Sequence, residues 1–170
     1  MRRLALVLSL LLLLGVIGGC GKKKANLNPG VPKNIAVLTL DGDLINQSVD
    51  QQRELDRVLR WMDRDIIRSL KRSGFNADMI KDRGSYKPAM GKLLIVKVED
   101  FNAGNRAARA FVGFGAGAAS LDLDYTLHDE KGDTLLAWKD GVGSSKGGTY
   151  CAQTLNRNAT EKIVHFLNGN

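Results

Sequence analysis

The chain has 170 residues, a length that suits one domain with a single hydrophobic core. Lysine and arginine outnumber aspartate and glutamate by 25 to 18, which gives a formal net charge of +7 at pH 7. Much of this excess lies before position 34, so the remainder is close to neutral and does not indicate a nucleic-acid partner. Two cysteines, Cys20 and Cys151, are too few for a disulfide framework or a cysteine-rich metal site.

The first twenty residues are typical of a secretory signal peptide. Arg2 and Arg3 precede an apolar run at 4–17, and two glycines precede Cys20. The run is shorter than the roughly 20 apolar residues that a transmembrane helix needs. The sequence Ile-Gly-Gly-Cys at 17–20 resembles the bacterial lipobox, which implies cleavage before Cys20 and acylation of that residue. The alternatives are an ordinary secretory cleavage near Gly19 and an uncleaved anchor.

The residues after Cys20 suggest to which membrane the protein is sorted and where its domain begins. By similarity to the sorting of enterobacterial lipoproteins, a glycine rather than an aspartate after the cysteine favours the outer membrane. We therefore predict a signal peptide over 1–19, a lipidated tether over 20–33 and a single periplasmic domain over 34–170. The tether is rich in lysine and interrupted by proline and glycine, so we expect it to be extended and flexible.

Hydrophobic periodicity predicts the elements of the domain. Short apolar or alternating runs predict strands at 34–40, 75–80, 92–101, 121–128 and 134–142. Helical periodicity predicts helices at 48–73 and 149–167. The order β-α-(β)-β-β-β-α indicates an α/β (α+β) sandwich, in which two helices cover one mixed or antiparallel sheet of about four to five strands.

Both predicted helices are amphipathic. In the second, the residues expected to face the core are Ala152, Leu155, Ala159, Ile163 and Phe166. In the first, the apolar stripe comprises Leu55, Val58, Leu59, Met62, Ile66 and Leu70. Its opposite side is a basic ridge formed by Arg53, Arg57, Arg60, Arg64, Arg68 and Lys71, with Trp61 beside it. The ridge either binds an anionic partner (lipid headgroups, lipopolysaccharide phosphates or an acidic protein) or is a solvated face offset by flanking carboxylates.

Two glycine-containing segments lack the context of a phosphate-binding motif. Alternate glycines at 113, 115 and 117 lead into a strand rather than a helix, so we expect a twist, a bulge or close packing there. Arg106 and Arg109 precede them and are candidate partner-binding residues. Lys146 lies among small residues at 143–148, in a predicted flexible loop with no supporting motif.

The remaining polar residues do not suggest a metal or cofactor. Asp122, Asp124 and His128 share one face of a predicted strand, but no further ligand cluster completes a site. Lys97 and Lys139 are available to pair with these carboxylates. We expect Cys151 to be a buried thiol that behaves as a small apolar side chain.

Residues 101–138 resemble a known family. The resemblance lies in Gly104-Asn105-Arg106, Arg109, the string Val-Gly-Phe-Gly-Ala-Gly-Ala at 112–118 and the Lys131-Gly132-Asp133 turn. They look like domain of unknown function 4410, whose members are mostly small envelope lipoproteins, and the resemblance implies no established activity. The element order is similar to the curli secretion lipoprotein, the lipoprotein activators of peptidoglycan synthases and the amino-terminal domain of the Tol translocation protein TolB.

These features favour a non-enzymatic outer-membrane lipoprotein whose periplasmic domain binds or scaffolds another envelope protein or glycan. The candidate partner-binding residues are Arg57, Arg60, Trp61, Arg64, Arg68, Arg106 and Arg109. No nucleophile–base pair or carboxylate pair stands out, so we predict no catalytic residue, no metal and no cofactor. The alternatives are a self-assembling subunit of a secretion or envelope complex and, less favoured, a hydrolase.

Overall fold

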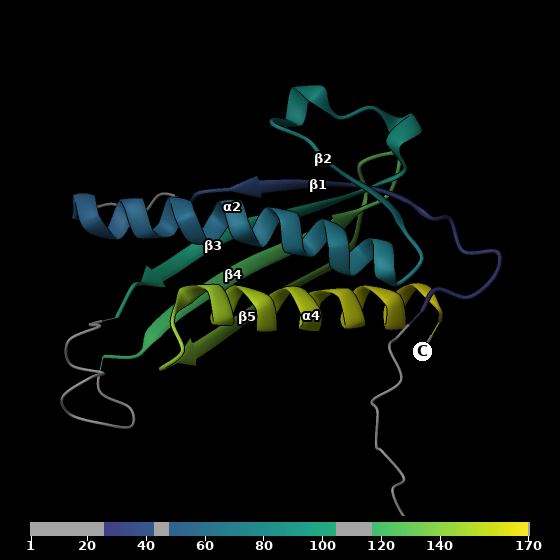
Figure 1. Ribbon diagram of the computed structural model, residues 1–170. Coiled ribbons are helices and arrows are strands. Elements are labelled where there is room, and N and C mark those ends of the chain that lie inside the picture. Colours follow the sequence, from purple (N-terminus) through teal and green to yellow (C-terminus); the bar gives the residue numbers. More distant parts are fainter. Residues whose placement is uncertain (1–25, 43–47, 105–116, 170) are drawn as a thin grey trace, which may run out of the picture.

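The computed structural model describes residues 26–42, 48–104 and 117–169. The predicted signal peptide, Cys20, Arg106 and Arg109 lie outside the described residues, as do the glycines at 113 and 115. In the described part, one sheet carries two long helices side by side (Figure 1).

The elements follow the predicted order. The strands are β1 (Asn34–Leu40), β2 (Asn76–Met79), β3 (Lys92–Asn102), β4 (Ala119–His128) and β5 (Thr134–Ser144). The helices are α2 (Val49–Arg72) and α4 (Gly148–Leu167), and two short 3-10 turns at Arg83–Ser85 and Pro88–Met90 join β2 to β3. The loop predicted at 143–148 is shorter than expected, because β5 continues to Ser144 and α4 begins at Gly148.

The sheet is mixed and has the strand order β2-β1-β3-β4-β5. β1 pairs in parallel with β2 and β3, whereas β3, β4 and β5 form antiparallel pairs. Parallel strands need a crossover connection, and α2 provides it between β1 and β2. The predicted α+β fold with two helices is therefore confirmed.

Helix α2 begins and packs as its sequence predicts. Ser48 and Gln51 form a capping box, in which each side chain accepts a hydrogen bond from the other residue's backbone N–H. Gly74, with a φ of 98°, follows the helix end and allows the chain to reverse towards β2. The buried residues of α2 are the six predicted ones: Leu55, Val58, Leu59, Met62, Ile66 and Leu70.

Helix α4 buries a broader side than its apolar stripe. The prediction for Phe166 was wrong, because this side chain is 39% exposed in the last turn of the helix. A row spaced four residues apart, Asn156, Thr160 and Val164, is buried instead. The reason is that α4 packs against α2 as well as the sheet: Asn156 Nδ2 donates to the Met62 carbonyl oxygen over 3.0 Å.

A bulge in β3 adds an aromatic side chain to the core. Leu94, Val96 and Val98 face the helices, as the alternation predicts. Strict alternation would place Phe101 on the opposite face of the sheet. The register with β4 shifts between Val98 and Asp100, and Phe101 is consequently buried in the same core cluster.

The segment before β1 is held against the carboxyl ends of both helices. The Leu27 N–H donates to the Ser73 carbonyl oxygen over 3.0 Å. The Asn28 N–H donates to Asn168 Oδ1 over 2.8 Å, and Asn168 Nδ2 donates to the Asn26 carbonyl oxygen over 2.9 Å. The chain therefore enters the domain where α2 and α4 both end, which is the right-hand side of Figure 1.

Candidate binding site beside helix α2

Residues 54–64 of α2 and the beginning of α4 border a depression of about 360 Å³. Helix α2 contributes Arg57, Trp61 and Arg64 to its lining, and the start of α4 contributes the segment 146–149. Ala103, just after β3, lies at its margin. Because α2 and α4 run in the same direction, this depression lies at the opposite end of the helices from the point where the chain enters the domain.

Trp61 gives the depression an aromatic surface. The side chain of Trp61 is partly buried against the main core, and its exposed part lines the depression. An indole combines a large apolar surface with one N–H donor, so it contacts both apolar and polar groups of a partner. Because packing already restricts the Trp61 side chain, a partner that binds it would cost little additional conformational entropy.

The charges around the depression are only partly neutralised by neighbouring carboxylates. Arg57 forms an ion pair with Glu54, which also lines the depression. Arg64 makes no ion pair with any carboxylate in the described part of the chain. The Lys146 ammonium lies 4.5 Å from the centre of the Tyr150 ring, in a cation–π contact, and it forms no ion pair with a carboxylate of the described ranges.

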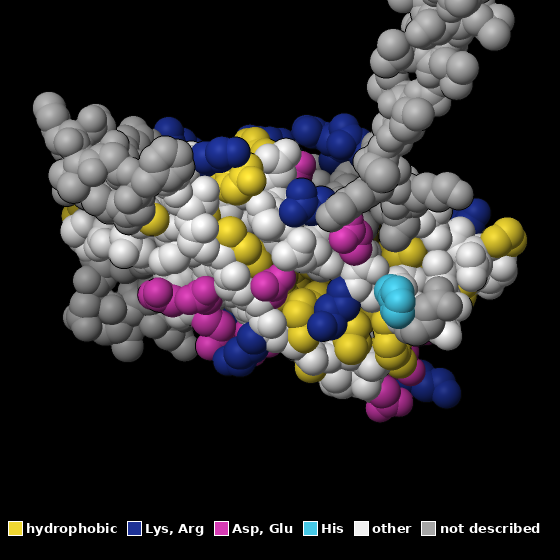
Figure 2. Space-filling model, turned by 90° about the horizontal axis from the view of Figure 1, so that it is seen from below, with side chains coloured by type: hydrophobic (Ala, Val, Ile, Leu, Met, Phe, Trp, Pro, Cys, Tyr) yellow, Lys and Arg dark blue, Asp and Glu magenta, His cyan; other side chains and the backbone are white. Residues whose placement is uncertain are grey.

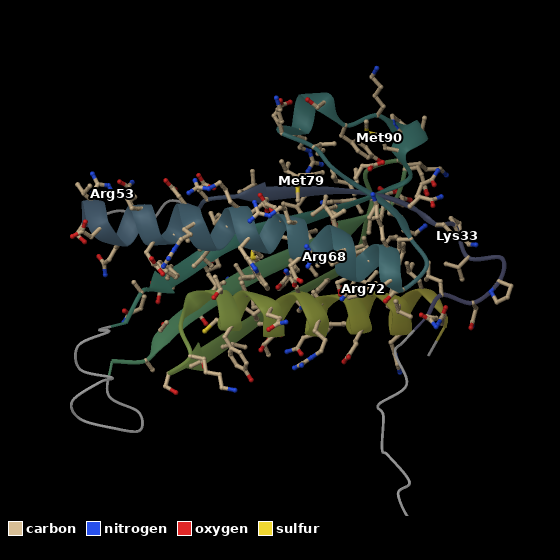
Figure 3. The ribbon with its side chains drawn as sticks, viewed as in Figure 1. Lys33, Arg53, Arg68, Arg72, Met79 and Met90 are labelled. Atoms are coloured by element: carbon tan, nitrogen blue, oxygen red, sulfur yellow. The ribbon has the colours of Figure 1, made fainter. Side chains whose placement is uncertain are left out.

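The rest of the basic ridge extends along α2 beyond the depression. Figure 3 labels Arg53 near the start of the helix and Arg68 and Arg72 in its second half. Arg53 pairs with Asp50 over 3.7 Å, whereas Arg60 and Arg68 are exposed without an ion pair among the described residues. Ion pairs therefore offset the two ends of the ridge, since Lys71 pairs with Asp78 over 3.8 Å, and leave its middle part unpaired among the described residues.

Asp63 fixes the rotation of α2 relative to the sheet. The Thr39 hydroxyl of β1 donates to Asp63 Oδ1 over 2.7 Å. Burial raises the pKa of Asp63, and Asp41 raises it further, while the Thr39 hydrogen bond and the charge of Arg64 lower it. The contact between Thr39 and Asp63 holds one side of α2 against β1, so the adjacent Arg64 is presented to solvent.

One member of the predicted polar row on β4, Asp124, is engaged in an ion pair. Asp124 lies opposite Lys97 on one side and Lys139 on the other. The Lys139 ammonium lies 3.6 Å from Asp124 Oδ2 and 3.2 Å from Glu99 Oε2. Hydrogen bonds from Lys139 and Lys97 lower the pKa of Glu99. Within the described ranges, no group of three histidine, cysteine, aspartate or glutamate side chains is placed to hold a metal ion.

Cys151 is buried at the start of α4. Its thiol lies 3.6 Å from the carbonyl oxygen of Ala119, and burial raises its pKa. A thiol with a raised pKa is a poor nucleophile, so the side chain contributes packing, as predicted. His165 is exposed in the last turn of α4.

The site combines predicted and unpredicted residues. Arg57, Trp61 and Arg64 were predicted as partner-binding residues and lie together, while Arg60 and Arg68 do not line the depression. Lys146 was not predicted, because its loop carries no recognisable motif. The parallel packing of α2 and α4 is what brings it to the predicted residues.

None of the helices in the described part of the chain is both long and apolar enough to cross a membrane. The features define an α+β domain with one mixed sheet, two parallel helices and a basic depression between the first two thirds of α2 and the beginning of α4. The chain belongs to the family described as domain of unknown function (DUF4410), whose model matches residues 23–149. This match confirms the family resemblance seen in the sequence. No curated protein matches the chain.

Several solved structures are similar at low sequence identity. PelC from Paraburkholderia phytofirmans, solved as a dodecamer, is 8% identical with a TM-score of 0.47, over 81% of this chain and 88% of PelC. A second PelC dodecamer structure, of a variant, is 12% identical with a TM-score of 0.45, over 84% and 90% of the two chains. A putative neuraminyllactose-binding hemagglutinin homologue from Helicobacter pylori is 9% identical with a TM-score of 0.36, over 86% and 88%.

Proposed function

We propose that this protein is a lipid-anchored, non-enzymatic outer-membrane lipoprotein whose periplasmic domain binds an envelope protein or glycan with negative charge at the contact. The observation that carries the binding role is the depression lined by Arg57, Trp61, Arg64 and Lys146. Arginine and tryptophan are the side chains that most often dominate binding energy at interfaces. A guanidinium also binds a carboxylate or phosphate through two parallel hydrogen bonds.

The position of the tether supports a partner away from the membrane surface. Five residues separate Cys20 from Asn26, and a chain of that length spans about 20 Å at most. The stretch of α2 from Arg57 to Ser73 adds roughly 24 Å at 1.5 Å per residue. Because the chain enters the domain at the far end of α2, the depression lies far along the helix from the attachment point and would be able to reach partners away from the headgroups. An envelope protein or glycan therefore fits this site better than the anchoring membrane itself.

The anchor sets the mechanism of this binding. A single acyl chain gives only marginal membrane binding, whereas the several chains of a bacterial lipoprotein give a stable anchor. A domain held near one membrane experiences a raised effective concentration of partners in the same layer. Modest affinity at the depression would then suffice for a stable complex.

The anchor is tested by Cys20→Ser in the full chain expressed in a bacterial envelope. We expect the variant to lose its acyl groups and to leave the membrane fraction, because the sulfur that accepts the lipid is gone. Metabolic labelling with a radioactive fatty acid and fractionation of the envelope measure this change. Unchanged labelling and sedimentation would contradict lipidation at Cys20, and Cys151→Ser serves as the matched control.

The binding role is tested by reversing two charges in the depression, Arg57→Glu with Arg64→Glu. In-cell crosslinking followed by affinity purification and mass spectrometry should show partner adducts reduced at least about tenfold, as expected for interface arginines. The control, Arg83→Glu with Arg157→Glu, makes the same change at exposed positions outside the depression and should keep the adducts. Equal adducts in both double variants would refute the site. Adducts that survive protease digestion but not glycan hydrolysis would identify the partner as a glycan.

A further inference from the structure

We propose a second binding surface, which consists of the free edge of β5 and the seam, defined as the partly buried side chains of β5 that border α4 (Leu136, Trp138 and Val142). This surface would pair with an extended strand of another protein, and that strand would carry an acidic residue. The surface is distinct from the depression and does not depend on the function proposed for it. Addition of a strand to an exposed sheet edge is a common mode of peptide recognition, in which backbone hydrogen bonds supply affinity and alternate side chains supply specificity.

The edge at β5 lacks the usual protection of edge strands. β5 is 11 residues long, lies last in the sheet order and, in the described part of the chain, pairs only with β4. It contains no proline, and both of its charged side chains are engaged within the domain. Lys139 is bound by Glu99 and Asp124, and Asp140 accepts hydrogen bonds from Asn158 and from the Gly141 N–H. The opposite edge, β2, has only four residues, one of them Asp78. Natural sheets protect edges by shortness, proline and free charge, so β5 is the edge open to pairing.

The seam offers apolar contacts at the spacing of a strand. Leu136, Trp138 and Val142 point towards the helix layer and pack on the core, yet each remains only partly buried. Trp138 is held in place by stacking on Tyr125, with 4.7 Å between ring centres. Figure 2 views the molecule from below, and hydrophobic side chains gather in the middle of this face. A strand added beside β5 would place every second side chain against this apolar row.

The charges along the seam select an acidic occupant. The Lys162 ammonium of α4 lies 5.7 Å from the centre of the Trp138 ring, and it makes no ion pair with a described carboxylate. The neighbouring Asp140 keeps its negative charge, but both of its oxygens are fixed within the domain, because Asn158 Nδ2 donates to Oδ2 over 3.1 Å and the Gly141 N–H donates to Oδ1 over 2.9 Å. Lys162, in contrast, has its ammonium directed over the Trp138 ring. A strand residue opposite Trp138 therefore meets a positive charge. A second copy of β5, paired about a twofold axis near Trp138, would instead bring Lys139 and Lys162 towards their own counterparts.

The test uses a synthetic nine-residue peptide in which valine alternates with threonine and glutamate replaces the central valine. Hydrogen–deuterium exchange is measured on the full lipidated chain in detergent micelles. At ten times the Kd of the peptide, we expect the exposed β5 amides to exchange about tenfold more slowly, because pairing must open before they exchange. The amides of β2 should be unaffected. The same peptide with proline in place of the threonine beside the glutamate should not bind.

Charge variants separate this site from nonspecific pairing. Lys162→Glu should weaken the glutamate peptide about two- to five-fold and strengthen a peptide with central lysine, the range expected for an exposed ion pair. Lys87→Glu, an exposed change on another part of the domain, should alter neither affinity. No slowing at β5, equal slowing by the proline peptide, or no response to Lys162→Glu would overturn the proposal. Protection of β5 that rises with protein concentration without peptide would assign the edge to a second copy instead.

Discussion

Gly91→Ala is expected to destabilise the domain by about 3 kcal/mol or more. Gly91 joins the second 3-10 turn to β3 with a φ of 79°, a conformation that costs a residue with a side chain about 1–2 kcal/mol. A Cβ atom there would also overlap the carbonyl oxygen of Asn34, at the start of β1. Relief would require moving the backbone of β1 or β3, two interior strands of the sheet that pair in parallel here.

Urea unfolding followed by circular dichroism measures this loss. Gly132→Ala is a matched control, because Gly132 has a φ of 94° but nothing within 4 Å of an added Cβ. We expect the control to lose only the conformational cost, about 1–2 kcal/mol. Equal losses in the two variants would show that the close approach to Asn34 contributes nothing.

Asn156→Asp is expected to lower the free energy of unfolding by about 3–5 kcal/mol at pH 7, because it would leave a buried charge without a partner. Asn156 is 1% exposed, and its Nδ2 donates to the Met62 carbonyl oxygen and, over 3.1 Å, to Asp65 Oδ2. The substitution keeps the shape of the side chain but replaces the donor by a carboxylate oxygen. That oxygen would face two acceptors, one of them charged, at the contact that joins α4 to α2.

The pH dependence of this loss follows from the sign of the pKa change. Burial and the charge of Asp65 raise the pKa of the new carboxyl above its unfolded value, near 3.9. The loss in free energy of unfolding should therefore be complete above the pKa that the new carboxyl has in the folded state. It should shrink as the pH falls from there towards the pKa of the unfolded state. Unfolding of variant and parent at pH 7 and pH 4 tests this, with exposed Gln153→Glu as the charge control. A loss equal at both pH values would contradict the mechanism.

The helical pattern of α2 was sufficient to predict where the helix begins and which side of it is buried. Its apolar stripe, its capping box and its exposed arginines all follow from side chains within the same 24-residue segment. The depression could not be predicted in this way, because Lys146 and Trp61 belong to segments far apart in the sequence. Only the parallel packing of α2 and α4 places these side chains around the same space.

The core shows the same division between local pattern and tertiary contact. Strand alternation predicted the inward faces of β3 and β4, since adjacent side chains of a strand point to opposite faces. It did not predict Phe101, whose burial depends on a bulge formed against β4, or Asn156, whose polar side chain is satisfied only by α2.

The sequence by itself determined the elements, their order, the basic ridge and the family, because each depends on residues close together in the chain. The tertiary structure alone decided which ridge residues line the same depression as Lys146, which polar side chain is buried and which strands form the edges of the sheet. Those features arise from contacts between distant segments, and no periodicity within one segment specifies them.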